Sequence, residues 1–335
     1  MISFSKINIS QVSDYRTQIM GLAAVMIIAC HAPASGVKMP YILAKILELG
    51  NFGVDIFLFL SGLGCYYSLS KNRGGYLCYF KRRFSRLMIP YVLITLPFCL
   101  FYLIVGRDNI LDTFYSLTTL EYWLFHKGAW FVAFMIPIYL LSPALYKICD
   151  GTNKSWVFVA ILIIITALLS SVPSVNPVVS NIQSALLRMP SYLIGMAIAP
   201  YCINKKTISV IWGILLFFCY FVFCLLHVRQ YAIWAIIPVI IYLSVLLVKF
   251  LCKIPKINEF IKLMGNISLE SYLTNIYLNS LFIFLIPDYI SSPIFYGRYV
   301  EYVTVIVLGI AMAYVYKVCL ERYSNKKYNV RLNIK

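Results

Sequence analysis

The chain has 335 residues, of which 61% are hydrophobic and only 12% charged, and its mean hydropathy is +0.83. Soluble domains usually have about 25% charged residues, so this composition excludes a soluble protein and indicates that lipid is the solvent for most of the chain. The net charge of +17 does not indicate nucleic-acid binding, because the Lys and Arg residues are spread over the links between apolar runs instead of forming one face or arm.

Apolar runs of about 20 residues, the length that crosses a bilayer, recur along the chain. They predict ten spans, over residues 17–34, 50–70, 87–105, 129–147, 156–173, 183–202, 208–226, 231–249, 268–287 and 299–319. No small-residue cleavage site follows the first run, so we expect a retained helix there and not a signal peptide. The sequence therefore predicts an all-α polytopic membrane protein, with one transmembrane domain over residues 1–335 and a short basic tail at 320–335.

The basic residues predict how these spans are oriented. Of the 29 Lys and Arg residues, 22 fall on the side of the N-terminus, six fall on the other side, and Arg188 lies within the sixth span. Lys and Arg concentrate in the cytoplasmic loops of membrane proteins. We therefore expect both termini in the cytoplasm.

The ten cysteines do not indicate a metal site. Most of them lie in apolar runs and none forms a CxxC pair, whereas metal ligation needs clustered ligands at close spacing. We expect these cysteines to act as small hydrophobic residues and no metal to be bound.

Five ionisable residues lie within the predicted spans or at their outer edge: His31, Asp55, Glu121, Arg188 and Glu270. Charged groups are costly in a bilayer, so such residues mark a site, a pathway or a buried ion pair. His31 ends the first apolar run, on the outer side. The alternative for Asp55 and Glu270 is that one of them pairs with Arg188 and joins two helices.

The densest basic run follows the second span. Lys81, Arg82, Arg83 and Arg86 lie there among aromatic residues, on the predicted cytoplasmic side. One interpretation is an anchor on anionic lipid. The other is a phosphate-binding surface for a cytoplasmic ligand, because Lys and Arg bind phosphate well.

Six segments together resemble one known family. They are LAAVMIIACH (22–31), FGVDIFLFLSG (52–62), YFKRRFSRLMIPY (79–91), AWFVAFMIPIYLLSP (129–143), LRMPSYLIG (187–195) and GNISLESYL (265–273). In this order, on a frame of ten spans, they resemble the acyltransferase-3 family of bacterial membrane acyltransferases, over about residues 16–280.

The resemblance implies an enzyme of the bacterial cytoplasmic membrane that moves an acyl group, commonly acetyl from acetyl-CoA, to a hydroxyl. It implies a carbohydrate of the envelope, or a related extracytoplasmic molecule, as acceptor, and acyl-CoA as a co-substrate with no permanently bound cofactor. The rival interpretation is a transporter or flippase for a lipid-linked or small anionic molecule. That rival predicts a pair of interrupted helices at the midplane, and the sequence has no clear Gly- or Pro-interrupted pair.

The resemblance also implies roles for the ionisable residues. His31 matches the histidine of the family's first helix and would be the general base, which removes the proton of the attacking hydroxyl. The family's first-helix arginine, with ten residues between it and the histidine, falls on Met20 here, so Arg16 would take its place. Arg188 or Arg16 would stabilise the negative charge that develops on the thioester carbonyl, or hold a phosphate of CoA.

The remaining candidates would bind the donor or the acceptor. We expect Lys81, Arg82, Arg83 and Arg86 to bind acyl-CoA. A second set would support the site or line an acceptor pocket: Asp55, Glu121, Trp130, Tyr192, Glu270 and Tyr272. Asn275 occupies a position where many family members have histidine, so no histidine is required there.

Overall fold

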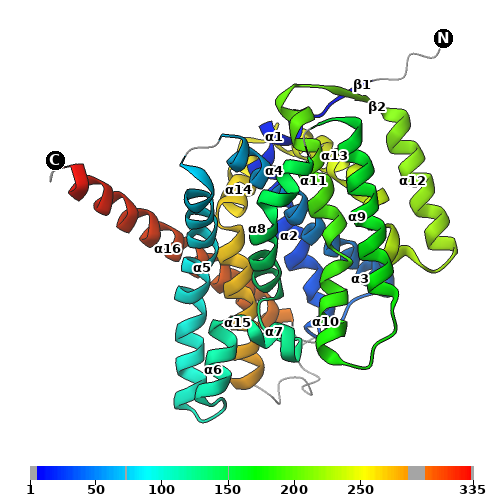
Figure 1. The fold of residues 1–335 in the computed structure, drawn as a ribbon. Coiled ribbons are helices and arrows are strands. Elements are labelled where there is room, and N and C mark those ends of the chain that lie inside the picture. The colour runs from blue at the N-terminus through cyan, green and yellow to red at the C-terminus, as the bar shows by residue number, and fades with distance from the viewer. Residues whose placement is uncertain (1–5, 72–73, 150, 286–298, 333–335) are drawn as a thin grey trace.

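The computed structural model describes residues 6–71, 74–149, 151–285 and 299–332 and is a bundle of helices with one small sheet at one end (Figure 1). The elements in chain order are β1 Lys6–Asn8, α1 Gln11–Asp14, α2 Arg16–Ala34, α3 Tyr41–Glu48, η1 Leu49–Asn51, α4 Phe52–Ser70, α5 Gly75–Ile104, α6 Ile110–Leu117, α7 Leu120–Phe125, α8 Trp130–Ile148, α9 Asn153–Ser171, α10 Pro177–Leu186, α11 Met189–Ile203, β2 Thr207–Ser209, α12 Val210–Leu225, η2 Arg229–Ala232, α13 Ile233–Leu251, α14 Pro255–Asn266, α15 Ser268–Leu285 and α16 Tyr299–Leu332.

The prediction of an all-α polytopic membrane protein is confirmed at the level of fold class, since 84% of the structure is helical. Within the described ranges, seven helical segments are long and apolar enough to cross a membrane: Tyr41–Ser70, Gly75–Ile104, Trp130–Ile148, Lys154–Ser171, Pro177–Ile203, Gln230–Leu251 and Tyr299–Arg322. Helix α12 is apolar but shorter. The predicted first and ninth spans correspond to α2 and α15, which pack against neighbouring helices and carry polar residues. A helix inside a bundle can be less apolar than one that faces lipid.

Three predicted boundaries differ from the structure. Helix α5 begins at Gly75, so the basic run 81–86 is helical and not part of a loop. The sixth span is two helices, α10 and α11, which meet at Leu187 and Arg188. Helix α16 continues to Leu332, so most of the predicted tail extends the last helix. The end of the ninth span, residues 286–287, lies outside the described residues.

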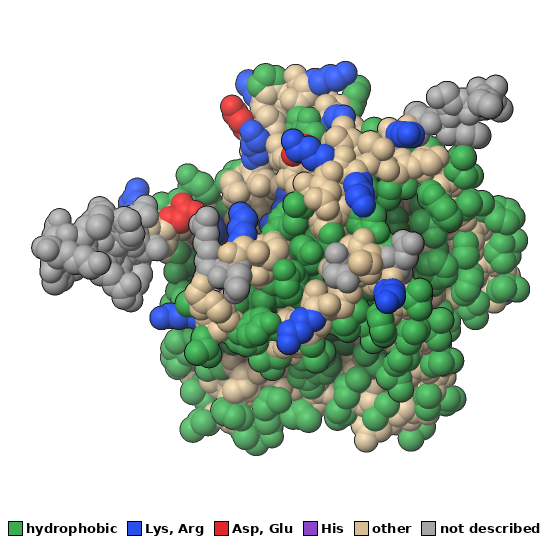
Figure 2. Space-filling view, turned by 45° about the horizontal axis from the view of Figure 1, so that its top comes forward, with side chains coloured by type: hydrophobic (Ala, Val, Ile, Leu, Met, Phe, Trp, Pro, Cys, Tyr) green, Lys and Arg blue, Asp and Glu red, His purple; other side chains and the backbone are tan. Residues whose placement is uncertain are grey.

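One end of the bundle is basic. The antiparallel pair β1–β2, helices α1 and α14 and the first turns of α5 lie at this end, at the top of Figure 1. Figure 2 turns this end forward, and many Lys and Arg side chains gather on it. We call it the basic pole, and we call the end with α6 and α7 the opposite pole. The distribution matches the charge asymmetry of the sequence.

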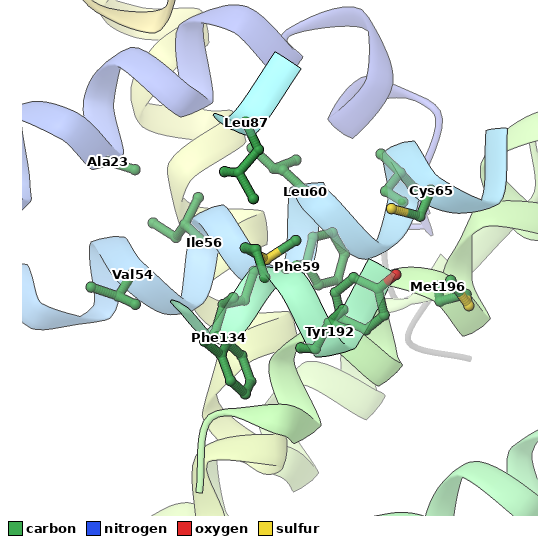
Figure 3. Packing of buried hydrophobic residues seen from close by; sticks show 14 of the residues in the cluster. Ala23, Val54, Ile56, Phe59, Leu60, Cys65, Leu87, Phe134, Tyr192 and Met196 are labelled. Atoms are coloured by element: carbon green, nitrogen blue, oxygen red, sulfur yellow. The ribbon is translucent and has the colours of Figure 1, made fainter. Parts of the chain in front are cut away.

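The core lies where α2, α4, α5, α8 and α11 meet (Figure 3). Phe59, Leu60 and Tyr192 are almost fully buried there. Helices α4 and α11 can approach closely because Gly195 has no side chain. A Cβ at this position would lie only 2.0 Å from the carbonyl oxygen of Phe59. Small residues allow such approaches in membrane proteins.

A second close approach fixes α2 against α14, the helix that precedes α15. A Cβ at Gly21 would lie 1.9 Å from the carbonyl oxygen of Ile261, and one at Gly265 would lie 2.0 Å from that of Thr17. Helix α14 is therefore in backbone contact with the first turns of α2. Because α15 follows α14 after one residue, this contact also sets where the polar face of α15 lies relative to α2.

Candidate active site

The His31 cavity lies between α2, α15 and α16 and has a volume of about 150 Å³. His31 is exposed at its wall, near the C-terminal end of α2. The cavity is lined by Ile27, Ile28, His31, Ser35, Tyr272, Asn275, Ile276, Asn279, Tyr302 and Val305. It therefore combines one imidazole with several neutral polar groups and an apolar remainder.

The ring of His31 is held by its own helix. Its Nδ1 atom lies 2.7 Å from the carbonyl oxygen of Ile27, one turn earlier. A carbonyl oxygen only accepts hydrogen bonds, so Nδ1 carries the proton in the neutral ring. The lone pair is then on Nε2, which is the form that a general base needs.

Helix α15 contributes a polar stripe to the cavity. Tyr272, Asn275 and Asn279 are spaced by three and four residues, so they lie on one face of the helix. The backbone N–H of Phe131 donates to the Tyr272 hydroxyl oxygen at 3.3 Å, and the Asn275 amide donates to the Ser271 carbonyl at 2.7 Å. Only Tyr272 was among the candidates from the sequence, although the i, i+3, i+7 spacing of polar residues was a readable signal.

Tyr302 comes from α16, far away in the sequence. Its hydroxyl donates to the carbonyl oxygen of Ile28, on the turn of α2 that precedes His31. Val305 follows one turn later on the same helix and is almost fully buried. Nothing in the sequence indicated that the last helix would close this cavity, because no polar pattern on this helix predicts which helix it packs against.

A larger cavity, of about 730 Å³, lies toward the basic pole between α2, α5, α15 and α16. We call it the basic cavity. Arg86 and Lys317 line it, together with Glu270, whose Oε1 lies 3.4 Å from Lys317 Nζ. Met20 also lines it, so one helix contributes to both cavities. Its two cations and one carboxylate leave an excess of positive charge.

The four basic residues of the run 81–86 do not act as one surface. Lys81 and Arg82 are exposed, while Arg86 lines the basic cavity. Arg83 turns inward, where its guanidinium donates to the carbonyl oxygen of Gly64 on α4 and lies 5.9 Å from the centre of the Tyr79 ring. Arg83 therefore ties α5 to α4.

Arg16 lies at the start of α2, far from His31. Fifteen residues of helix separate the two, which corresponds to about 22 Å. Its Nη2 donates to the Leu60 carbonyl at 3.1 Å, and its buried Nε has no hydrogen-bond partner among the described residues. Arg83 and Arg86 lie within electrostatic reach of it. The structure thus groups Arg16 with the basic pole and not with the His31 cavity.

Arg188 forms an ion pair with Asp55, whose side chain is fully buried. Ser191 donates to the other carboxylate oxygen at 2.8 Å. Of the two possible partners that the sequence left open, Asp55 is therefore the one that pairs with Arg188, while Glu270 pairs with Lys317. The charge of Arg188 also acts on Cys30, the residue before His31, so the pair lies at the same end of α2 as His31.

The remaining candidates lie outside both cavities. Tyr192 is fully buried and shares a hydrogen bond of 2.7 Å with Ser142. Trp130 packs against other rings at the start of α8, and its neighbour Phe131 contacts the ring of Tyr272. Neither Tyr192 nor Trp130 is among the residues that line the His31 cavity or the basic cavity.

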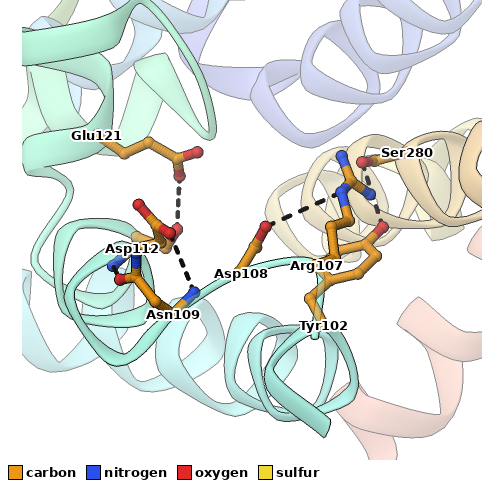
Figure 4. A network of polar contacts seen from close by, with 8 residues as sticks. Tyr102, Arg107, Asp108, Asn109, Asp112, Glu121 and Ser280 are labelled. Atoms are coloured by element: carbon orange, nitrogen blue, oxygen red, sulfur yellow. Dashed lines mark hydrogen bonds and ion pairs between the residues drawn. The ribbon is translucent and has the colours of Figure 1, made fainter. Parts of the chain in front are cut away.

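Glu121 belongs to a polar network at the opposite pole (Figure 4). Its Oε2 accepts from the Ser116 hydroxyl at 2.6 Å. Nearby, Tyr102 donates to Ser280 on α15, and Arg107 lies over the Tyr102 ring. In α7, burial raises the pKa of the Tyr122 hydroxyl above its usual value. The Ser116–Glu121 bond joins α6 to α7, and the Tyr102–Ser280 bond joins α5 to α15. Glu121 therefore has a place in the packing of that pole.

Comparison with known proteins identifies a family. The acyltransferase-3 family model, described as an acyltransferase domain, matches residues 19–318, which run from α2 into α16. No curated protein and no solved structure matches the chain. In the described part of the chain, no group of three or more His, Cys, Asp or Glu residues is arranged to hold a metal ion.

Proposed function

The chain belongs to the acyltransferase-3 family, and on this premise we propose that it transfers an acetyl group from cytoplasmic acetyl-CoA to a hydroxyl of an envelope carbohydrate or a related extracytoplasmic acceptor. Membership of the family supports an acyltransferase activity, and together with the apolar helices it supports a multi-pass membrane protein. The donor, the acyl group, the acceptor and the bacterial inner membrane are parts of the proposal.

The observation that carries the proposal is the orientation of the His31 ring. Because Nδ1–H is bonded to Ile27, the unprotonated Nε2 is the nitrogen of this cavity-lining ring that remains available to accept a proton. An acceptor hydroxyl in this cavity would lose its proton to Nε2 as its oxygen attacks the thioester carbon. The volume of about 150 Å³ suits a short acyl group, since an engineered cavity of that size in another protein holds benzene.

The basic cavity supports the choice of CoA as carrier. CoA carries phosphate groups, and Arg and Lys are their usual partners. Arg86 and Lys317 line this cavity, with Lys81 and Arg82 exposed at the same pole. We assign phosphate contacts to Arg86 and Lys317, and electrostatic attraction of the donor to Lys81, Arg82 and Arg16.

The spacing of the two cavities supports transfer across the membrane. Met20 in the basic cavity and His31 lie eleven residues apart on α2, which corresponds to about 16 Å along the helix axis. Helices α15 and α16 also line both cavities. The pantetheine arm of CoA would extend along this seam from the basic pole and bring its thioester to His31.

The test uses the purified full chain in lipid vesicles with radiolabelled acetyl-CoA and an envelope glycan fraction. Wild type is compared with His31→Ala and with His227→Asn, a matched control because His227 is an exposed histidine that lines neither cavity. We expect label transfer by wild type and the control, and a loss of at least about 100-fold in His31→Ala.

Two results would contradict the proposal. If an inserted His31→Ala protein kept full transferase activity, His31 would not be the base. If well-folded wild type neither bound nor turned over any acyl-CoA, transport of a lipid-linked or small anionic molecule would become the better interpretation.

A further inference from the structure

The polar groups that line the His31 cavity differ in whether they are already engaged. Tyr302 and Asn275 donate to backbone carbonyls, and the Tyr272 hydroxyl accepts from a backbone N–H. Within the described residues, the side chains of Ser35 and Asn279 make no hydrogen bond. These two are therefore the neutral groups that have full bonding capacity for a ligand.

Asn279 is the better placed of the two. Ser35 is the C-cap residue of α2, at the start of the link to α3, where the backbone is less constrained. Asn279 lies inside α15 and is half-buried. A side chain on a helix face is held more accurately than one at a helix end, and accurate placement is what electrostatic catalysis requires.

The neighbours of Asn279 fix the wall around it. One turn earlier, Asn275 lies against Gly309 of α16, where a Cβ would come within 2.9 Å of the Asn275 amide. Thr274 donates to the carbonyl oxygen of the same glycine at 2.8 Å. Helices α15 and α16 are thus locked together beside the cavity, so the backbone that carries Asn279 is held in place.

Of the two arginines that the sequence suggested for charge stabilisation, one is distant from His31 and the other is already paired. Arg16 lies about 22 Å along α2 from His31, and Arg188 is paired with Asp55. A neutral amide is also the cheaper donor in a membrane, because burying it costs much less than burying a cation.

Resting on the function proposed above, we infer that Asn279 is a further catalytic residue, whose side-chain N–H donates to the carbonyl oxygen of the acyl group. The acceptor oxygen forms a bond to the thioester carbon while Nε2 of His31 takes the hydroxyl proton. The carbonyl π electrons move to the oxygen, and the Asn279 N–H bonds to this oxyanion. The intermediate collapses with cleavage of the C–S bond, and the CoA thiolate takes the proton back from His31.

The experiment measures kcat and KM for acetyl-CoA with the full chain in lipid vesicles, from the release of radiolabelled acetate and from label transfer to envelope glycan. Radiolabel is preferred to a thiol reagent because the chain has ten free cysteines. The variants are Asn279→Ala and Asn279→Leu. The leucine variant removes the amide while keeping a side chain of similar size. Ser280→Ala is the matched control, since Ser280 is the next residue and bonds to Tyr102, away from the cavity.

We expect both Asn279 variants to lose about 100-fold or more in kcat, with KM for acetyl-CoA within about threefold of wild type, because the bond strengthens as the oxyanion forms. Retention of labelled acetyl-CoA by the vesicles checks that the variants are folded. The Ser280→Ala control should keep both parameters.

The outcomes separate this inference from the function on which it rests. If wild type is active and His31→Ala is not, but Asn279→Ala keeps its kcat or changes only KM, the role of Asn279 is wrong and the function stands. The same holds if Ser35→Ala, and not Asn279→Ala, loses kcat. If wild type itself has no acyl-CoA turnover, the proposed function fails.

Discussion

The Nδ1 atom of His31 lies 2.7 Å from the carbonyl oxygen of Ile27, so the histidine is oriented by the helix that carries it. This arrangement needs no carboxylate beside the ring, unlike the common triad in which an acid orients the imidazole. It makes the local geometry of α2 part of the site.

Phosphate recognition should depend on Arg86. Replacing it by Gln removes a cation from the basic cavity, and we expect KM for acetyl-CoA to rise about tenfold or more with little change in kcat. The control is Lys253→Gln, because Lys253 is an exposed cation near the same pole that lines neither cavity. Equal effects of both substitutions on KM would mean that the overall positive charge of the basic pole attracts the donor, without a specific contact at Arg86.

The size of the His31 cavity should limit the acyl group. Val305 and Ile276 supply apolar wall, so Val305→Ala or Ile276→Ala adds room for methylene groups. One methylene changes discrimination by about 10- to 200-fold, so we expect the ratio of kcat/KM for butyryl-CoA over acetyl-CoA to rise by at least about tenfold. Val303→Ala, an exposed position on the same helix, should leave this ratio unchanged.

The Arg188–Asp55 pair should stabilise the bundle only as a pair. Arg188→Met leaves a fully buried carboxylate without its cation, which we expect to cost about 3–5 kcal/mol. The double variant Arg188→Met with Asp55→Leu removes both charges and should recover most of that loss. The free energy of unfolding is measured in detergent, with heat or denaturant to unfold the variants. A double variant that is no more stable than Arg188→Met would contradict the prediction.

Close approach of α4 and α11 should depend on Gly195. An alanine Cβ there would meet the Phe59 carbonyl oxygen at 2.0 Å, so Gly195→Ala must push the helices apart. We expect a loss of about 1–3 kcal/mol in unfolding free energy. Gly213→Ala on α12 is the matched control, because nothing lies within 4 Å of its Cβ position. Similar melting temperatures for the two variants would contradict this role of Gly195.

Much of the fold could be predicted because membrane spans are strongly constrained by composition. The apolar runs predicted the helices, and the fold class and family are confirmed, while the number of spans and their orientation stay predictions. Boundaries were less accurate where polar residues continue a helix. The first turns of α5 and the last turns of α16 are helical although they are basic, because local propensity continues a helix beyond the apolar run.

The candidate site could be predicted only in part. His31 and Tyr272 line the same cavity, and the roles that the resemblance implies for them stay predictions. Arg83 was expected to bind acyl-CoA, and Tyr192 to support the site or line an acceptor pocket. In the structure Arg83 contacts α4 and Tyr192 contacts α8 inside the protein. A basic run shows where cations lie along the chain, while the rotation of a helix decides which of them turn inward.

The sequence by itself determined that lipid surrounds this chain, that its structure is helical, and that one end of the bundle is basic. Each of these follows from transfer free energies and charge counts, which are sums over residues. The tertiary structure alone decided that Asn279, Tyr302 and His31 face one cavity and that Lys317 lies beside Arg86 in another. These contacts depend on how helices far apart in sequence are rotated about their axes and on how closely glycines let them approach. Helical periodicity predicts which face of a helix is buried, but not which helix packs against that face.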